Sequence, residues 1–145
     1  MSILSDLFVA DPADALRYET EAVRAHERPS WVRGRAQFTG LIDLHYEVLW
    51  AAVDGRTWQP DSHSLEELSM RKDGGAWLFR FPPSFVATLA AIDAGKLDPV
   101  ADRWIESGEL HGATAAEVLP VLHELTQLAR LAQAGGKDLF LWGSL

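Results

Sequence analysis

The stretch Leu68–Phe81 reads Leu-Ser-Met-Arg-Lys-Asp-Gly-Gly-Ala-Trp-Leu-Phe-Arg-Phe, and it decides the fold. Its Asp-Gly step supplies the positive φ of a tight turn, so Leu68–Arg71 and Ala76–Phe81 are predicted to form a β-hairpin. In the second strand every second residue from Trp77 to Phe81 is aromatic, which places three rings on one face. Because such a face must be covered, the hairpin indicates a sheet that packs against helices.

Helical periodicity and capping signals predict about five helices around this hairpin. Asp11-Pro12 and Asp98-Pro99 each pair an N-cap residue with a proline at the first helical position. Thr114 to Glu117 forms a capping box, but Pro120 conflicts with it, so we expect a turn or kink before a regular helix that reaches Ala134. The other predicted elements are an edge strand at 3–9, a helix from Pro12 towards Pro29, a helix at 38–53, a helix from Ser84 to Gly95, and a strand at 138–142.

These elements predict an α+β fold in a single domain that spans residues 1–145. We expect about five helices on one side of a small, mainly antiparallel sheet, which consists of the hairpin and the terminal strand with 3–9 added at an edge. No repeat or linker divides the 145 residues.

Composition and charge exclude several classes of function. The chain has 13 basic and 21 acidic residues, and a net charge of −8 disfavours binding to nucleic acid or anionic membranes. The absence of cysteine excludes disulfides, zinc–thiolate sites and thiol nucleophiles. No signal peptide is recognisable, and the apolar stretch at 85–92 is too short to span a bilayer. We therefore expect a cytoplasmic protein without nucleic-acid or membrane partners.

Three residues are candidates for acid–base catalysis. His45 lies in the apolar stripe of its predicted helix, where it is either a core histidine bonded to a carbonyl or a pocket acid, base or ligand. Asp61 and His63 place a carboxylate and an imidazole in one loop. Two such groups do not make a metal site, and no phosphate-binding glycine motif is present, so neither a metal nor a cofactor is expected.

A second set of residues indicates binding rather than catalysis. The segment from Arg24 to Arg35 is locally basic, and guanidinium groups beside an indole can hold an anion, although they can also simply cap a helix. Six tryptophans are many for one small core, so some indole surface should face outward. The predicted binding residues are Trp31, Arg33, Arg35, Trp58 and Arg80. Of these, we expect Trp31, Trp58 and Arg80 to lie with His63 at the rim of a cleft.

The order of the elements, with a few short motifs, resembles a known family. The features are Leu44-His45 in a helix that ends near Asp54-Gly55, Gly74-Gly75 before a proline-led helix, and the strand Leu139–Trp142. In these respects the chain resembles the YfbM-like family of bacterial domains of unknown function. Where that family has a tryptophan four positions before the histidine, this chain has Leu41. The resemblance implies an α+β fold and no established activity, so it assigns no catalytic residue.

The missing catalytic motifs favour a non-catalytic interaction protein, which meets a protein partner or a second copy, as a homodimer, through an aromatic-rich surface. One alternative is a small metal-independent hydrolase or lyase. In it His45 or His63 is the general base, Asp61 orients the base, and Arg80 holds an anionic substrate. Another alternative is a carrier of a small anionic metabolite, which would bind at residues 24–35.

Overall fold

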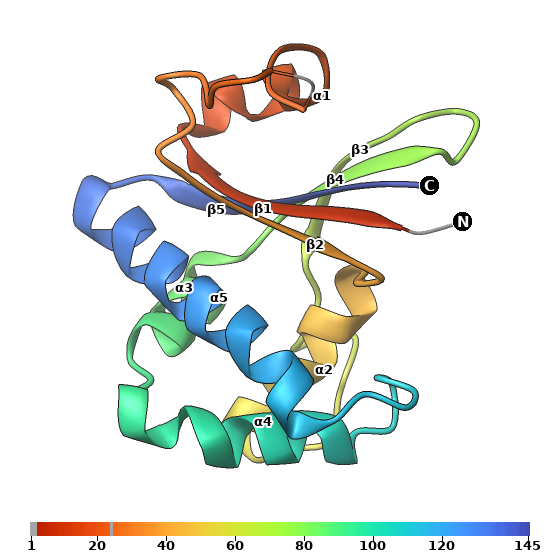
Figure 1. Ribbon diagram of the computed structural model, residues 1–145, viewed down its shortest axis with the longest axis vertical. Coiled ribbons are helices and arrows are strands. Elements are labelled where there is room, and N and C mark those ends of the chain that lie inside the picture. The colour runs from red at the N-terminus through yellow and green to blue at the C-terminus, as the bar shows by residue number, and fades with distance from the viewer. Residues whose placement is uncertain (1–2, 24) are drawn as a thin grey trace.

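The computed structural model describes residues 3–23 and 25–145, and an antiparallel five-stranded sheet runs through its centre (Figure 1). The strands lie in the order β2-β1-β5-β4-β3, so β2 and β3 form the two edges. Their bounds are Leu4–Ala10 for β1, Gly34–Thr39 for β2, Glu66–Met70 for β3, Ala76–Arg80 for β4 and Asp138–Ser144 for β5. The predicted hairpin is β3 and β4, and the predicted terminal strand is β5.

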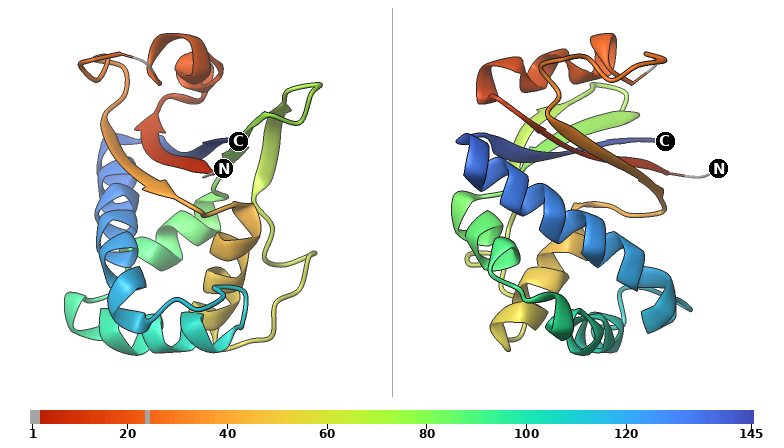
Figure 2. Two further views of the ribbon diagram at one scale, coloured as in Figure 1. Left: turned by 45° about the vertical axis from the view of Figure 1, so that its right-hand side comes forward. Right: turned by 60° about the vertical axis from the view of Figure 1, so that its left-hand side comes forward.

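Helices lie on both faces of this sheet, which corrects the prediction that they pack on one side. The α-helices are α1 (Tyr18–Glu21), α2 (Asp43–Asp54), α3 (Pro83–Ala90), α4 (Leu97–Glu106) and α5 (Ala115–Gly135), and 3₁₀ turns span Pro12–Arg17 (η1) and Ala94–Lys96 (η2). Figure 2 shows η1 and α1 above the sheet and the other helices below it. The reason is that β1 and β5 are buried on both faces, so each face requires a cover. The α+β class itself is confirmed.

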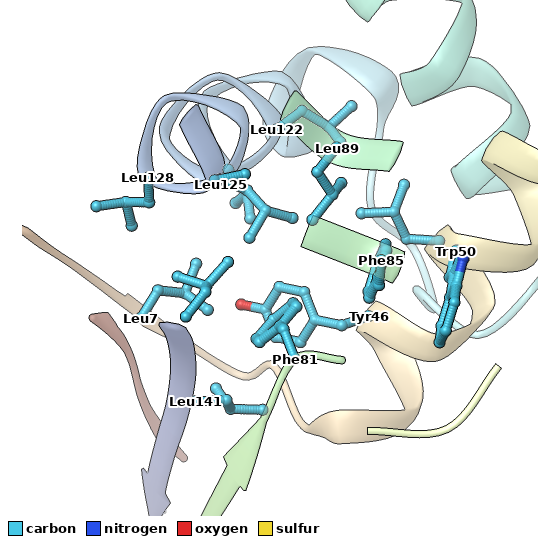
Figure 3. Close-up of a cluster of buried hydrophobic side chains, with 14 of the residues drawn as sticks. Leu7, Tyr46, Trp50, Phe81, Phe85, Leu89, Leu122, Leu125, Leu128 and Leu141 are labelled. Atoms are coloured by element: carbon cyan, nitrogen blue, oxygen red, sulfur yellow. The ribbon is translucent and has the colours of Figure 1, made fainter. Parts of the chain in front are cut away.

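Two hydrophobic clusters share the sheet. The larger one lies on the side of α2 to α5, where the buried Tyr46 ring packs between the sheet and α5 (Figure 3). The smaller one lies on the side of α1, where the Phe8 and Tyr18 rings stack with their centroids 4.0 Å apart. Alternation along β4 matches the prediction, because Phe79 belongs to the larger cluster and Leu78 to the smaller one.

Several predicted boundaries are wrong, and β2 is the most important case. The helix expected at 38–53 starts only at Asp43, because residues 34–39 pair with β1 instead. Gly40 separates the two elements with a positive φ of 81°, a conformation that glycine adopts without strain. The strand predicted at an edge, residues 3–9, is β1, which lies between β2 and β5.

Two helices also differ from their predictions. The helix expected from Pro12 towards Pro29 is a 3₁₀ turn followed by one α-helical turn that ends at Glu21. In contrast, α5 is continuous from Ala115 and includes Pro120, so no separate turn precedes it. Among the described helices, none has the length and apolarity that crossing a membrane requires.

Candidate functional site

A pocket of about 820 Å³ surrounds β2 near the junction of β2, α2, α5 and the loop between α4 and α5. Figure 1 shows β2 leading down to α2 beside this loop. The pocket has walls on both faces of the sheet, because its lining residues fall on opposite sides of β2. On the α5 side the main lining residues are Phe38, Leu41, His45, Leu110, Val118 and Val121, and on the α1 side they are Leu4, Asp6, Gln37, Thr39 and Trp142.

Strand register explains this division of the lining. Asp6 lies opposite Gln37 in the β1–β2 pair, and Ser5 lies opposite Phe38. Because side chains alternate along a strand, Asp6 and Gln37 face the side of α1, whereas Phe38 faces α5. The β2 edge therefore separates a polar wall from a mainly apolar wall.

His45 stands in the apolar wall with one ring nitrogen already bonded within its own helix end. Its Nδ1 accepts the backbone N–H of Ile42 at 2.9 Å, so the proton of the neutral ring is on Nε2. Burial lowers the pKa of His45, and the neighbouring Glu109 only partly offsets this effect. The imidazole is therefore neutral at pH 7 and presents an N–H, which is not the arrangement that a general base needs.

Asp6 is the buried acid of the polar wall, with 4% of its surface exposed. Its Oδ2 accepts the Tyr18 hydroxyl at 2.6 Å and the Gln37 Nε2 amide at 3.3 Å. Burial, followed by the hydrogen bond to Asp6, raises the pKa of Tyr18 well above its ordinary value, so the phenol stays protonated and donates. These two donors fix the orientation of the carboxylate.

His63 pairs with Asp54 rather than with Asp61. His63 is 1% exposed, its Nδ1 accepts the Gln59 N–H at 3.1 Å, and its Nε2 lies 3.1 Å from Asp54 Oδ2. The edge of the ring also packs against Trp50. Asp61 is exposed in the same loop. The imidazole thus joins the loop to the end of α2, and it does not line the pocket around β2.

Glu47 makes a second connection between α2 and this loop. Its Oε2 accepts the buried backbone N–H of Leu65 at 2.9 Å. Burial raises the pKa of Glu47, an effect that the hydrogen bond from Leu65 opposes. Together, Glu47 and Asp54 hold the end of the loop that leads into β3, so these acidic groups of α2 have structural partners.

The cleft rim expected from Trp31, Trp58 and Arg80 is not formed, because the three side chains lie at separate places. Arg80 bonds Asp138 at 3.0 Å and Glu66 at 2.9 Å, and it lines a pocket on the side of α1. Trp31 packs under the Arg17 guanidinium, and Trp58 lines a pocket between α2 and α4. Arg33 lines another pocket with Leu131, whereas Arg35 donates to the Ala22 carbonyl at 3.1 Å. Arg24 of the basic segment is outside the described residues.

The tryptophans contribute less surface than their number suggested. Trp50, Trp104 and Trp142 are buried, whereas Trp31, Trp58 and Trp77 are partly covered. The large apolar side chains that are exposed in the described part of the chain are aliphatic, namely Leu4, Leu16, Leu68, Met70, Leu131 and Leu145. The indole rings therefore serve mainly in packing.

No group of three potential metal-binding side chains is found within residues 3–23 and 25–145. No family model, curated protein or solved structure matches the chain with significant similarity. The resemblance to the YfbM-like family therefore stays a prediction.

Asp6, Gln37 and the β2 edge were not predicted to be parts of a site. The available signal was the polar pair Ser5-Asp6 within an otherwise apolar strand, since buried polar residues are the informative exceptions. This signal indicates a site only when β2 is known to pair with β1, and the helix predicted at 38–53 overlapped β2.

Proposed function

We propose that this protein is a non-catalytic interaction module that binds an extended segment of a protein partner along β2. The observation that carries the proposal is the pocket of about 820 Å³ with walls on both faces of the sheet at an edge strand. A strand added to an edge gains backbone hydrogen bonds and sends alternate side chains to opposite faces. The two walls match this arrangement.

The backbone of β2 can supply the hydrogen bonds for such an added strand. Gly40 donates its N–H to the Ile3 carbonyl across the β1–β2 pair at 2.8 Å. Because antiparallel ladders alternate between residues that bond inward and residues that bond outward, the N–H and C=O groups of Gln37 and Thr39 face away from β1. These are the groups that a partner strand would pair with.

The opposite edge, β3, carries features that discourage pairing. Its register shifts between Glu67 and Ser69, and such bulges interrupt the ladder. This strand also begins with two charged residues, Glu66 and Glu67, and two more, Arg71 and Lys72, follow it in the turn. In contrast, β2 keeps an unbroken register with β1 and includes one charged residue, Arg35. Since native proteins commonly protect edges with bulges and charges, β2 is the edge better suited to a partner.

The proposal is tested by removing one outward N–H group from β2. Gln37→Pro deletes this donor, and Gln37→Ala is the matched control because it loses the same side chain but keeps the N–H. Peptides selected from a random display library on the wild-type protein serve as probes, with affinity measured by fluorescence polarisation. We expect the selected peptides to bind Gln37→Pro about tenfold more weakly than Gln37→Ala.

Two results would contradict this proposal. One is equal affinity of the peptides for the proline and alanine variants, provided that circular dichroism shows both variants folded. The other is a selection that yields no peptide with measurable affinity for the wild-type protein.

A further inference from the structure

The polar wall presents the Asp6 carboxyl group to whatever lies along β2. Asp6 is buried, and both of its hydrogen bonds from described residues end on Oδ2. Arg35 lies on the same face, opposite Phe8 in the strand register, where it donates to the Ala22 carbonyl and also interacts with the Tyr18 hydroxyl, but it is not among the described residues that line the pocket. Carboxylate Oδ1 therefore has the capacity to accept a further hydrogen bond.

The Asp, Glu, Lys and Arg side chains among the described lining residues of the pocket are all acidic. Glu109 and Glu117 join Asp6 in it, whereas the described lining residues include no lysine or arginine. Glu117 caps α5 by accepting the Thr114 N–H at 3.1 Å. This charge pattern complements a basic ligand and repels an acidic one.

The distance across the sheet limits which basic side chain can reach Asp6. Strands lie about 4.8 Å apart, so a residue paired with Gln37 on an added strand is roughly 10 Å from the backbone of Asp6. Lysine and arginine are long enough to cross Gln37, whereas short donors are not. The Gln37 side chain, whose Nε2 amide donates to Asp6, also has an amide oxygen with the capacity to accept a hydrogen bond.

The other wall determines the neighbours of this basic residue. Residues on either side of it in an added strand face α5, where Phe38, Leu41, Val118 and Val121 line the pocket. Apolar side chains gain free energy by burial against such a wall. An alternating order of apolar and basic residues therefore satisfies both faces.

We infer that the bound segment is an extended strand in which a lysine or arginine, flanked by apolar residues, crosses Gln37 to bond Asp6. This inference rests on the proposed function, since it requires pairing along β2. It adds the chemical identity of the occupant: a basic, alternating peptide segment of a protein partner.

The test uses capped synthetic peptides in which one central variable residue is flanked by valines. This residue is lysine, norleucine or glutamate, and a fourth peptide places the lysine beside its former position so that it faces α5. Titration calorimetry measures binding to the wild-type protein, Asp6→Asn and Gln37→Pro. A charge-assisted hydrogen bond predicts that wild-type protein binds the lysine peptide at least about tenfold more tightly than the norleucine peptide.

The preference for lysine should disappear in Asp6→Asn, which keeps an oxygen for the Tyr18 hydroxyl. Gln37→Pro should weaken the lysine and norleucine peptides by similar factors. The comparison of peptides on wild-type protein needs no variant, so it stands even if Asp6→Asn folds poorly.

The outcomes separate the inference from the proposed function. Equal binding of the lysine and norleucine peptides, or tighter binding of the glutamate peptide, overturns the inference, while sensitivity to Gln37→Pro would still support pairing along β2. Equal binding of the shifted lysine peptide also overturns it, because the basic group then has no fixed face. Insensitivity of every peptide to Gln37→Pro overturns the proposed function itself.

Discussion

The His63 side chain joins α2 to the loop that follows it. Its two ring nitrogens have different partners, since Nδ1 accepts from Gln59 and Nε2 contacts Asp54. In the neutral ring this arrangement places the proton on Nε2, which donates to the carboxylate. Both nitrogens are therefore used within the loop, and the ring packs against Trp50 at the same time.

We predict that His63→Ala lowers the free energy of unfolding by about 2–4 kcal/mol. The loss combines two hydrogen bonds, each worth about 1 kcal/mol, with the cavity left by a buried ring. Urea denaturation followed by circular dichroism measures it. The control is Asp61→Ala, which should change stability by less than about 0.5 kcal/mol because this carboxylate is exposed. Equal effects of the two substitutions would contradict the structural pairing of His63 with Asp54.

The hydrogen-bond partner of His63 was predicted incorrectly, which shows that a single sequence does not determine side-chain pairs within a loop. Asp61 was paired with His63 because the two are close along the chain, whereas the observed partner, Asp54, is at the end of α2. The path of the loop between Gly55 and Ser64 determines this choice, and turn-forming residues predict a loop without predicting its path. The expectation that His63 pairs with an acidic residue was therefore correct, but the acidic residue was Asp54 and not Asp61.

Among the secondary-structure elements, α5 contains the clearest local conflict. Pro120 lacks the N–H that would bond the Ala116 carbonyl, and its ring crowds the preceding turn. The helix nevertheless runs through this position, because Thr114 and Glu117 form the predicted capping box and buried residues such as Val118 and Leu122 anchor it on both sides. Packing therefore outweighs the proline penalty of about 3 kcal/mol.

We predict that Pro120→Ala raises the free energy of unfolding by about 1–3 kcal/mol. Alanine restores the missing hydrogen bond, and the greater freedom of the unfolded chain offsets part of this gain. Thermal denaturation compares this variant with Thr114→Ala, which should lower stability by about 1 kcal/mol through loss of the N-cap. A decrease in stability for Pro120→Ala would show that the proline ring makes a packing contribution larger than its backbone cost.

The element β2 shows why the site was harder to predict than the hairpin. The hairpin depends on neighbours in sequence, and Lys72-Asp-Gly-Gly75 contains its turn signal. By contrast, β2 forms because residues 34–39 pair with β1 about thirty positions earlier, as in the pair of Leu7 with Ala36. Apolar residues from Phe38 onward also fit a helical period, so local pattern alone favoured the wrong element.

At the scale of the whole molecule, β1 and β5 connect the two hydrophobic clusters. Phe8 and Phe140 belong to the cluster under α1, whereas Leu7 and Leu141 belong to the cluster under α5. Composition and alternation were sufficient to predict the α+β class. They could not place β5 at the centre of the sheet, because its pairs with β1 and β4 join distant parts of the chain.

Because each cluster is built on the same two strands, neither should unfold without the other. We predict one cooperative unfolding transition, as expected for the single domain predicted from the sequence. Phe8→Ala weakens the cluster under α1, and Leu122→Ala weakens the cluster under α5. Each variant should lose about 3–5 kcal/mol while the urea m-value stays at that of the wild-type protein.

Tryptophan fluorescence and far-ultraviolet circular dichroism should report the same midpoint for each of these proteins, since the signals arise from both clusters and from the helices. If the α1 side formed a separate unit, Phe8→Ala would instead produce an early fluorescence change with little loss of helical signal. That result would divide the chain into two cooperative units. It would also mean that Tyr18 could detach from Asp6 while α5 stays folded, so the two walls of the pocket would not act together.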